Sequence, residues 1–186
     1  MRRRSVRDRI DRVNTVFFDV ETQRTFDEVG GRQNIRALGL AAAVTYSTAG
    51  GAFRHYTEED VAGLLAELQA AGLVVGFNVL RFDYEVLRAY GPLNPARTVD
   101  MLDQIYHRLG FRVSLGSLAE ATLGTGKSAD GLQAVRWYRE GRIQEILDYW
   151  QQDVEITRRL YEYGQQYKHL KYLDLNRRAR MVPVSW

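Results

Sequence analysis

The sequence has no cysteine and only three prolines among its 186 residues. The absence of cysteine excludes disulfide bonds, thiolate metal sites and cysteine nucleophiles. No stretch approaches the ~18 consecutive apolar residues of a membrane-spanning helix. The arginines at the N-terminus are not followed by the apolar segment of a secretory signal. We therefore expect a cytoplasmic protein with no membrane partner.

The remaining composition is that of an ordinary globular chain, with 45% hydrophobic and 26% charged residues. There is no internal repeat and no low-complexity linker, and the length suits one domain with a sizeable core. We expect a single domain over residues 1–186.

The net charge of +3 is unevenly distributed along the chain. Residues 1–12 and residues 168–186 each carry a net charge of +4, and subtracting these eight charges from the total leaves −5 for residues 13–167. Basic tails on an acidic body are typical of a protein that holds a polyanion at its margins. Solvated tails with no such role are the alternative.

Hydrophobic periodicity and turn residues predict the secondary structure. The expected strands are 15–21, 36–47 with a partner after a glycine turn, 73–77 and 98–100. The expected helices begin with 57–72 and a segment ending at 90, and continue with 101–109, 114–123, 132–140 and a long helix from 143. Adjacent antiparallel strands followed by alternating helices and strands predict an α/β fold, a mixed sheet flanked by helices.

Asp19 and Glu21 stand at the end of the first predicted strand, after the apolar residues 16–18. Residues two apart in a strand point to the same face, so the two carboxylates lie side by side. Like charges on a buried strand are costly unless a cation lies between them, and Mg²⁺ or Mn²⁺ prefers such oxygen ligands. By itself, the pair could equally mark an exposed strand end.

Two further segments carry carboxylates. Asp83 follows the strand 73–77 and is expected one turn into the next helix. Tyr149 and Asp153 are four residues apart on the long helix, so they share one face. Taken singly, Asp83 could be a solvated helix residue, and the Tyr–Asp pair could be a structural hydrogen bond.

In combination, D-x-E, N-x-x-x-F-D and Y-x-x-x-D occur in this order between Thr15 and Tyr161. The chain resembles the DEDD 3′–5′ exonuclease superfamily in its Tyr-bearing branch, and FDVETQ, VGFNVLRFDY and KSADGLQA are similar to its stand-alone or helicase-associated bacterial members. The resemblance implies an RNase H-like fold and hydrolysis of single-stranded DNA or RNA. Trp150 departs from the family pattern, in which a smaller residue follows the tyrosine.

The resemblance also implies roles for individual residues. Asp19 would bridge two Mg²⁺ or Mn²⁺ ions, Glu21 and Asp153 would complete the site of one ion, and Asp83 would serve the other. Tyr149 would position the attacking water, whereas the His-bearing branch places its histidine at the position of Asp148. Substrate-binding residues are expected at Thr22, Asn78 and Lys127.

The loop 124–131 contains glycines and Lys127, but it lacks the spacing of a phosphate-binding P-loop. We predict no nucleotide-hydrolysis site there, and Lys127 is either a phosphate contact or a solvated lysine. Among the aromatic residues, Trp137 is the candidate for stacking on a base.

The same residues admit three rival interpretations. A haloacid dehalogenase-like phosphatase requires a second aspartate where Glu21 stands. A catalytically weak or inactive nucleic-acid-binding module, accessory to a helicase, is disfavoured because the five motif residues are intact. A purely structural domain leaves the carboxylates on buried strands without a reason.

Overall fold

The computed structural model describes residues 13–125 and 131–186. Five strands form one sheet in the order β3-β2-β1-β4-β5. They are β1 (Thr15–Thr22), β2 (Leu40–Ser47), β3 (Ala52–Tyr56), β4 (Leu73–Gly76) and β5 (Thr98–Asp100). The pairs β1–β2 and β2–β3 are antiparallel, whereas β1–β4 and β4–β5 are parallel. The predicted mixed sheet is therefore confirmed.

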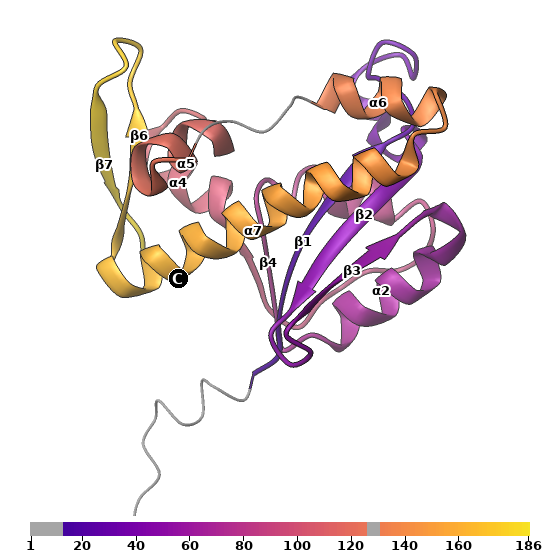
Figure 1. Ribbon diagram of the computed structural model, residues 1–186, viewed down its shortest axis with the longest axis horizontal. Helices are drawn as coiled ribbons and strands as arrows, with labels where there is room; N and C mark the ends of the chain where they lie inside the picture. The colour runs from indigo at the N-terminus through magenta and orange to yellow at the C-terminus, as the bar shows by residue number, and fades with distance from the viewer. Residues whose placement is uncertain (1–12, 126–130) are drawn as a thin grey trace, which may run out of the picture.

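Helices cover both faces of this sheet. They are η1 (Arg32–Ala37), η2 (Glu58–Asp60), α2 (Val61–Ala70), α3 (Asp83–Leu87), α4 (Met101–Leu109), α5 (Leu115–Leu123), α6 (Gly131–Arg139) and α7 (Ile143–Tyr167). Figure 1 shows α7 crossing one face of the sheet, with α2 on the opposite side next to β3. No helix of residues 13–125 or 131–186 is both long and apolar enough to cross a membrane.

The core has two layers because side chains of β1 alternate between the faces of the sheet. Phe17 packs in the layer that contains α4, α5 and α7, and its ring meets the ring of Tyr161 edge-on at 5.5 Å between centroids. Val16, Phe18 and Val20 pack in the other layer, against α2 and α3. Whether a residue of β1 has an odd or an even number thus decides whether its side chain faces α7.

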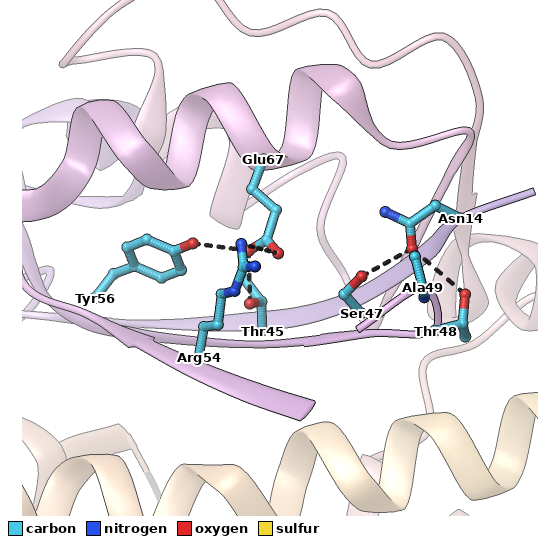
Figure 2. Close-up of polar contacts among 8 residues, drawn as sticks. All are labelled: Asn14, Thr45, Ser47, Thr48, Ala49, Arg54, Tyr56 and Glu67. Atoms are coloured by element: carbon cyan, nitrogen blue, oxygen red, sulfur yellow. Dashed lines mark hydrogen bonds and ion pairs between the residues drawn. The ribbon is translucent and has the colours of Figure 1, made fainter. Parts of the chain in front are cut away.

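On the α2 side, the carboxylate of Glu67 joins α2 to β2 and β3 (Figure 2). It accepts hydrogen bonds from the hydroxyls of Thr45 at 2.7 Å and Tyr56 at 2.9 Å, and it forms an ion pair with Arg54. The Thr45 side chain is fully buried. Burial removes the Thr45 hydroxyl from water, and Glu67 provides the hydrogen-bond acceptor that replaces it.

The side chain of Asn14 links the start of β1 to the turn between β2 and β3 through hydrogen bonds (Figure 2). Its Oδ1 accepts hydrogen bonds from the hydroxyl of Ser47 at 2.8 Å and from the backbone N–H of Ala49 at 3.1 Å. The antiparallel pair β1–β2 is thereby anchored at the end away from Glu21.

Residues 168–186 form a hairpin of β6 (His169–Leu173) and β7 (Ala179–Pro183), which the sequence pattern did not predict. Leu170 and Val182 are buried in the α7 layer, whereas Leu175 at the turn is fully exposed. The expected basic segment at this end is thus an ordered hairpin beside α5 (Figure 1). The other expected basic segment, residues 1–12, lies outside the described residues.

The start of the helix after β3 differs from the expectation. Thr57 was expected to cap a helix directly, but a 3₁₀ turn, η2, comes first and α2 begins at Val61. The Thr57 side chain makes no capping hydrogen bond. The expected apolar face is nevertheless present, because Leu64 and Leu68 are fully buried.

Candidate active site

Asp19 and Glu21 lie at the carboxyl end of β1, on the face of the sheet that also carries Phe17. This is the face that α7 covers. On α7, Asp153 precedes Thr157 and Tyr161 by one and two helical turns, and both of those side chains are buried. The alternation of β1 and the face of α7 therefore bring Asp153 toward the two carboxylates of the strand.

Asp83 reaches the same end of β1 from the other layer. It is the first residue of α3, not one turn inside a helix as the sequence pattern had indicated. Its side chain is only 2% exposed, and its Oδ1 accepts a hydrogen bond from the backbone N–H of Val20 at 3.1 Å. Val20 lies between Asp19 and Glu21, so this bond holds Asp83 against the acidic strand end.

A cavity of about 390 Å³ opens at this point. Asp19, Glu21 and Asp83 contribute its acidic lining. Three aromatic rings stand beside them in the wall of the cavity, those of Phe26, Phe77 and Phe82. Carboxylates next to flat apolar surfaces suit a ligand that combines cation-neutralised phosphate with a planar base.

Repulsion between like charges links the four predicted carboxylates. Burial raises the pKa of Asp19 well above its usual range, and repulsion from Asp83 and Asp153 raises it further. Burial, followed by repulsion from Asp19, Asp83 and Asp153, has the same effect on the pKa of Glu21. Burial raises the pKa of Asp83 to about 7, although backbone N–H groups act in the opposite direction. Asp19, Glu21 and Asp83 are thus destabilised as anions first by desolvation and then by neighbours of like charge, which for Asp83 is Asp100.

The possible metal donors of this cluster are all carboxylate oxygens. Clustered carboxylates are the ligands that Mg²⁺ and Mn²⁺ prefer, and a cation would relieve their repulsion. Within residues 13–125 and 131–186, however, no three acidic, histidine or cysteine side chains stand in an arrangement that could hold an ion. The chemistry of the donors nevertheless fits a divalent cation.

Tyr149 lies one turn before Asp153 on α7 and is partly buried. Its ring packs at 5.6 Å from the ring of Trp137 and at 5.0 Å from that of Trp150. Trp137 is in turn covered by the guanidinium of Arg142 at 5.3 Å. Trp137, which the sequence suggested as a base-stacking residue, is therefore engaged in supporting Tyr149. Trp150 is buried in the same aromatic cluster.

The predicted substrate-binding residues Thr22 and Asn78 both line the cavity. Thr22 is buried, and its hydroxyl donates to the carbonyl of Arg24 at 3.0 Å. Asn78 has a left-handed backbone with φ of 72°, a conformation that Asn tolerates better than most residues. Its side-chain oxygen accepts a hydrogen bond from Arg112 at 2.7 Å. Lys127 lies outside the described residues.

Asp100 is a residue of this region that the sequence analysis did not single out. It is buried at the end of β5 and accepts hydrogen bonds from three backbone N–H groups, those of Asn78, Leu80 and Asp103. It caps α4 and holds the loop that leads to Asp83. The available signal was the aspartate directly before a predicted helix, which is a typical N-cap.

The sheet order, the flanking helices and the acidic strand end define a family that sequence comparison identifies independently. The chain belongs to the RNase H superfamily, whose family profile matches residues 16–165. Membership of this superfamily supports a hydrolytic nuclease in general terms, with nucleic acid as the class of substrate and divalent ions as the usual cofactor.

Among solved structures, the fold is similar to the family B DNA polymerase from the hyperthermophilic archaeon Pyrobaculum calidifontis. The TM-score is 0.64 with 17% sequence identity over 83% of this chain, so the likeness concerns the fold alone. The match covers 25% of that polymerase, which means that the chain spans about a quarter of its length. A search of curated protein sequences finds no match.

Proposed function

We propose that this protein is a metal-dependent 3′–5′ exonuclease that hydrolyses single-stranded DNA or RNA. The observation that carries the proposal is the cluster of mutually repelling carboxylates at the end of β1, three of which line one cavity. A fold gains nothing from burying such a cluster, because each anion lowers stability at neutral pH. A cation-dependent reaction would explain why these carboxylates are buried together.

In this proposal Asp19, Glu21, Asp83 and Asp153 hold two divalent ions. Such ions, when bound, neutralise charge on the phosphoryl oxygens and make a water molecule more acidic. The residues of the chain supply orientation. Tyr149 would position the attacking water through its hydroxyl, and the Trp137 and Trp150 rings restrict the motion of its ring.

The cavity would hold the terminal nucleotide. The rings of Phe26, Phe77 and Phe82 offer apolar surface to its base, with Thr22 and Asn78 at the border between base and phosphate. A base stacked on aromatic surface is recognised without regard to its identity, which suits an enzyme that removes successive nucleotides. The polarity of digestion rests on the resemblance of the three motifs to the DEDD exonucleases.

The test is a time course on single-stranded DNA and RNA labelled at the 3′ or the 5′ end, with Mg²⁺, Mn²⁺ or EDTA. A 3′–5′ exonuclease releases the 3′ label at once as a mononucleotide and shortens the 5′-labelled strand stepwise. Asp19→Ala and Asp153→Ala serve as inactive controls. Release of the 5′ label first, or equal cleavage in EDTA, would contradict the proposal.

The second candidate is a catalytically weak or inactive nucleic-acid-binding module. The observation in its favour is that the acidic side chains described here do not stand in coordinating positions. Calorimetric titration with Mn²⁺ separates the two functions, since an active enzyme binds Mn²⁺ and the Asp19→Ala variant binds it more weakly. A helicase as partner of such a module is a prediction from the sequence resemblance, and the comparisons give it no support.

A further inference from the structure

A second surface adjoins the cavity on the same edge of the sheet. Strands β1, β4 and β5 are parallel neighbours, so their carboxyl ends lie at one edge. The acidic cavity occupies the ends of β1 and β4. The ends of β4 and β5, followed by α4, carry a group of side chains that the catalytic proposal does not use, those of Arg81, Tyr106 and Arg112. We call these three residues the α4 patch.

The α4 patch combines cations with an exposed ring. The Tyr106 ring is 38% exposed, and the guanidinium of Arg81 lies 5.9 Å from its centroid. The side chain of Arg81 is 61% exposed, with Asp103 at 3.6 Å as an acidic neighbour. An exposed pair of this kind gains little from its own ion pair or cation–π contact. The pairing of guanidinium and aromatic ring is instead the chemistry that binds phosphate and base together.

The patch is continuous with the cavity through Asn78. This residue lines the cavity, and it also borders a shallow indentation that Arg81, Asp100, Asp103, Tyr106 and Arg112 line with it. The hydrogen bond from Arg112 to the Asn78 side chain joins the two surfaces at 2.7 Å. The left-handed φ of Asn78 is a strained feature at this junction. A chain that leaves the cavity past Asn78 therefore meets the patch next.

We propose that the α4 patch binds the part of a single-stranded nucleic acid that continues beyond the terminal nucleotide in the cavity. Tyr106 stacks on a base, and Arg81 and Arg112 contact backbone phosphates. The occupant is a polyanion because the arginines are exposed, Arg81 at 61%, whereas their acidic neighbours Asp103 and Asp100 are 27% and 3% exposed. It is single-stranded because a ring stacks only on a base that is free of its duplex. The proposal rests on the proposed function for the placement of the terminal nucleotide in the cavity and for the direction in which the strand runs.

Two readouts separate the patch from the catalytic site. The first is the Kd of a fluorescent 12-nucleotide oligothymidylate, measured by anisotropy in EDTA so that no cleavage occurs. The second is kcat/KM for the p-nitrophenyl ester of thymidine 5′-monophosphate with Mn²⁺, because this substrate has no nucleotide beyond the one in the cavity. The test variant is Arg81→Ala with Tyr106→Ala, and Tyr106→Phe retains the stacking ring.

The matched control is Arg159→Ala with Tyr167→Ala. It also removes one exposed arginine and one exposed tyrosine, but from α7. Melting curves establish that all variants are folded. Loss of a stacked base weakens binding by roughly 5- to 150-fold, and loss of one phosphate contact lowers the slope of log Kd against log salt by about 0.7.

We expect the test variant to lose affinity for the 12-nucleotide strand by at least about fivefold and to keep its kcat/KM for the single-nucleotide ester. The control and Tyr106→Phe should bind like the unmodified protein. A 12-nucleotide Kd equal to that of the control, or no measurable binding by the unmodified protein, overturns the patch. An equal loss on both substrates also overturns it, because the residues would then belong to the catalytic cavity. If the unmodified protein binds the long strand through the patch but cleaves nothing, the catalytic proposal fails and the patch stands.

Discussion

The buried carboxylate of Asp83 leads to an unusual expectation, that removing a residue of the candidate site stabilises the metal-free protein. Burial raises the pKa of Asp83 from 3.8 to about 7. Above pH 7 the folded protein therefore contains an anion that the unfolded chain accommodates more easily. The substitution Asp83→Asn removes this charge, while the amide oxygen can still accept the hydrogen bond from Val20.

The magnitude follows from the pKa difference of about 3 units, at 1.36 kcal/mol per unit. Ionised Asp83 thus costs the folded state about 4 kcal/mol, and the new amide N–H₂ loses about 1–3 kcal/mol of this gain if it finds no acceptor. The expected net effect at pH 8 is a gain of about 2 kcal/mol, or roughly 4–8 °C in melting temperature for a chain of this length. The penalty develops as pH rises from 3.8 to 7 and is absent below both values. At pH 4 the variant should therefore gain nothing, and the unpaired amide should make it slightly less stable.

The assay is urea unfolding with EDTA at pH 4, 6 and 8. Asp100→Asn is the matched control, because Asp100 is equally buried but accepts hydrogen bonds from three backbone N–H groups. Its substitution removes one of the two acceptor oxygens and should cost about 1–3 kcal/mol at pH 8. The comparison is made at that pH because Asp100 itself raises the pKa of Asp83. If Asp83→Asn is destabilising by the same amount at pH 4 and pH 8, Asp83 is a structural residue and the reasoning from desolvation of its carboxylate fails.

Three further predictions concern other parts of the molecule. Tyr149→Phe should lower the single-turnover cleavage rate by about 10²-fold and leave Mn²⁺ affinity unchanged; a variant with full rate would remove the phenol from the mechanism. Glu67→Leu should lower the free energy of unfolding by about 2–4 kcal/mol, because the buried hydroxyl of Thr45 loses its acceptor, whereas Glu67→Gln keeps an acceptor and should cost less; equal losses would show that the hydrogen bonds are not the cause. Lys171→Gln with Arg178→Gln should reduce the salt slope of single-strand binding by about 1.4, and an unchanged slope would mean that the hairpin does not contact the substrate.

The sequence predicted most of the sheet and of the helices because their apolar patterns are strong. The helix from Ile143 and the strand at Thr98–Asp100 begin where they were expected. The hairpin β6–β7 was missed because its strands are short and basic, and few of its side chains are buried. Alternating burial at Leu170 and Val182 comes from packing on α5 and α7, which a local pattern does not contain.

Some features of the candidate site could be predicted from the sequence, and others could not. The carboxylates were found because charge on a buried strand conflicts with its surroundings, and that conflict is visible in the sequence. The path of the chain between Asn78 and Asp83 was not, since it depends on the left-handed backbone of Asn78 and on the hydrogen bonds to Asp100. The packing of Trp137 on Tyr149 is a contact between two helices, and no periodicity within one helix reveals it.

The pairing of β1 with β2 shifts by one residue immediately after Glu21, where Thr22 lies opposite Leu40 instead of Ala41. Up to that point, the same alternation that sends Phe17 toward α7 sends Asp19 and Glu21 there too. A slip of β1 by one residue would bury both acids against Leu64 and Leu68 and turn Phe18 toward Asp153. A chain in the wrong register would lose both its packed core and the cluster of carboxylates on which the proposed reaction depends. Under the proposed function, selection for catalysis at this strand is also selection for accurate folding.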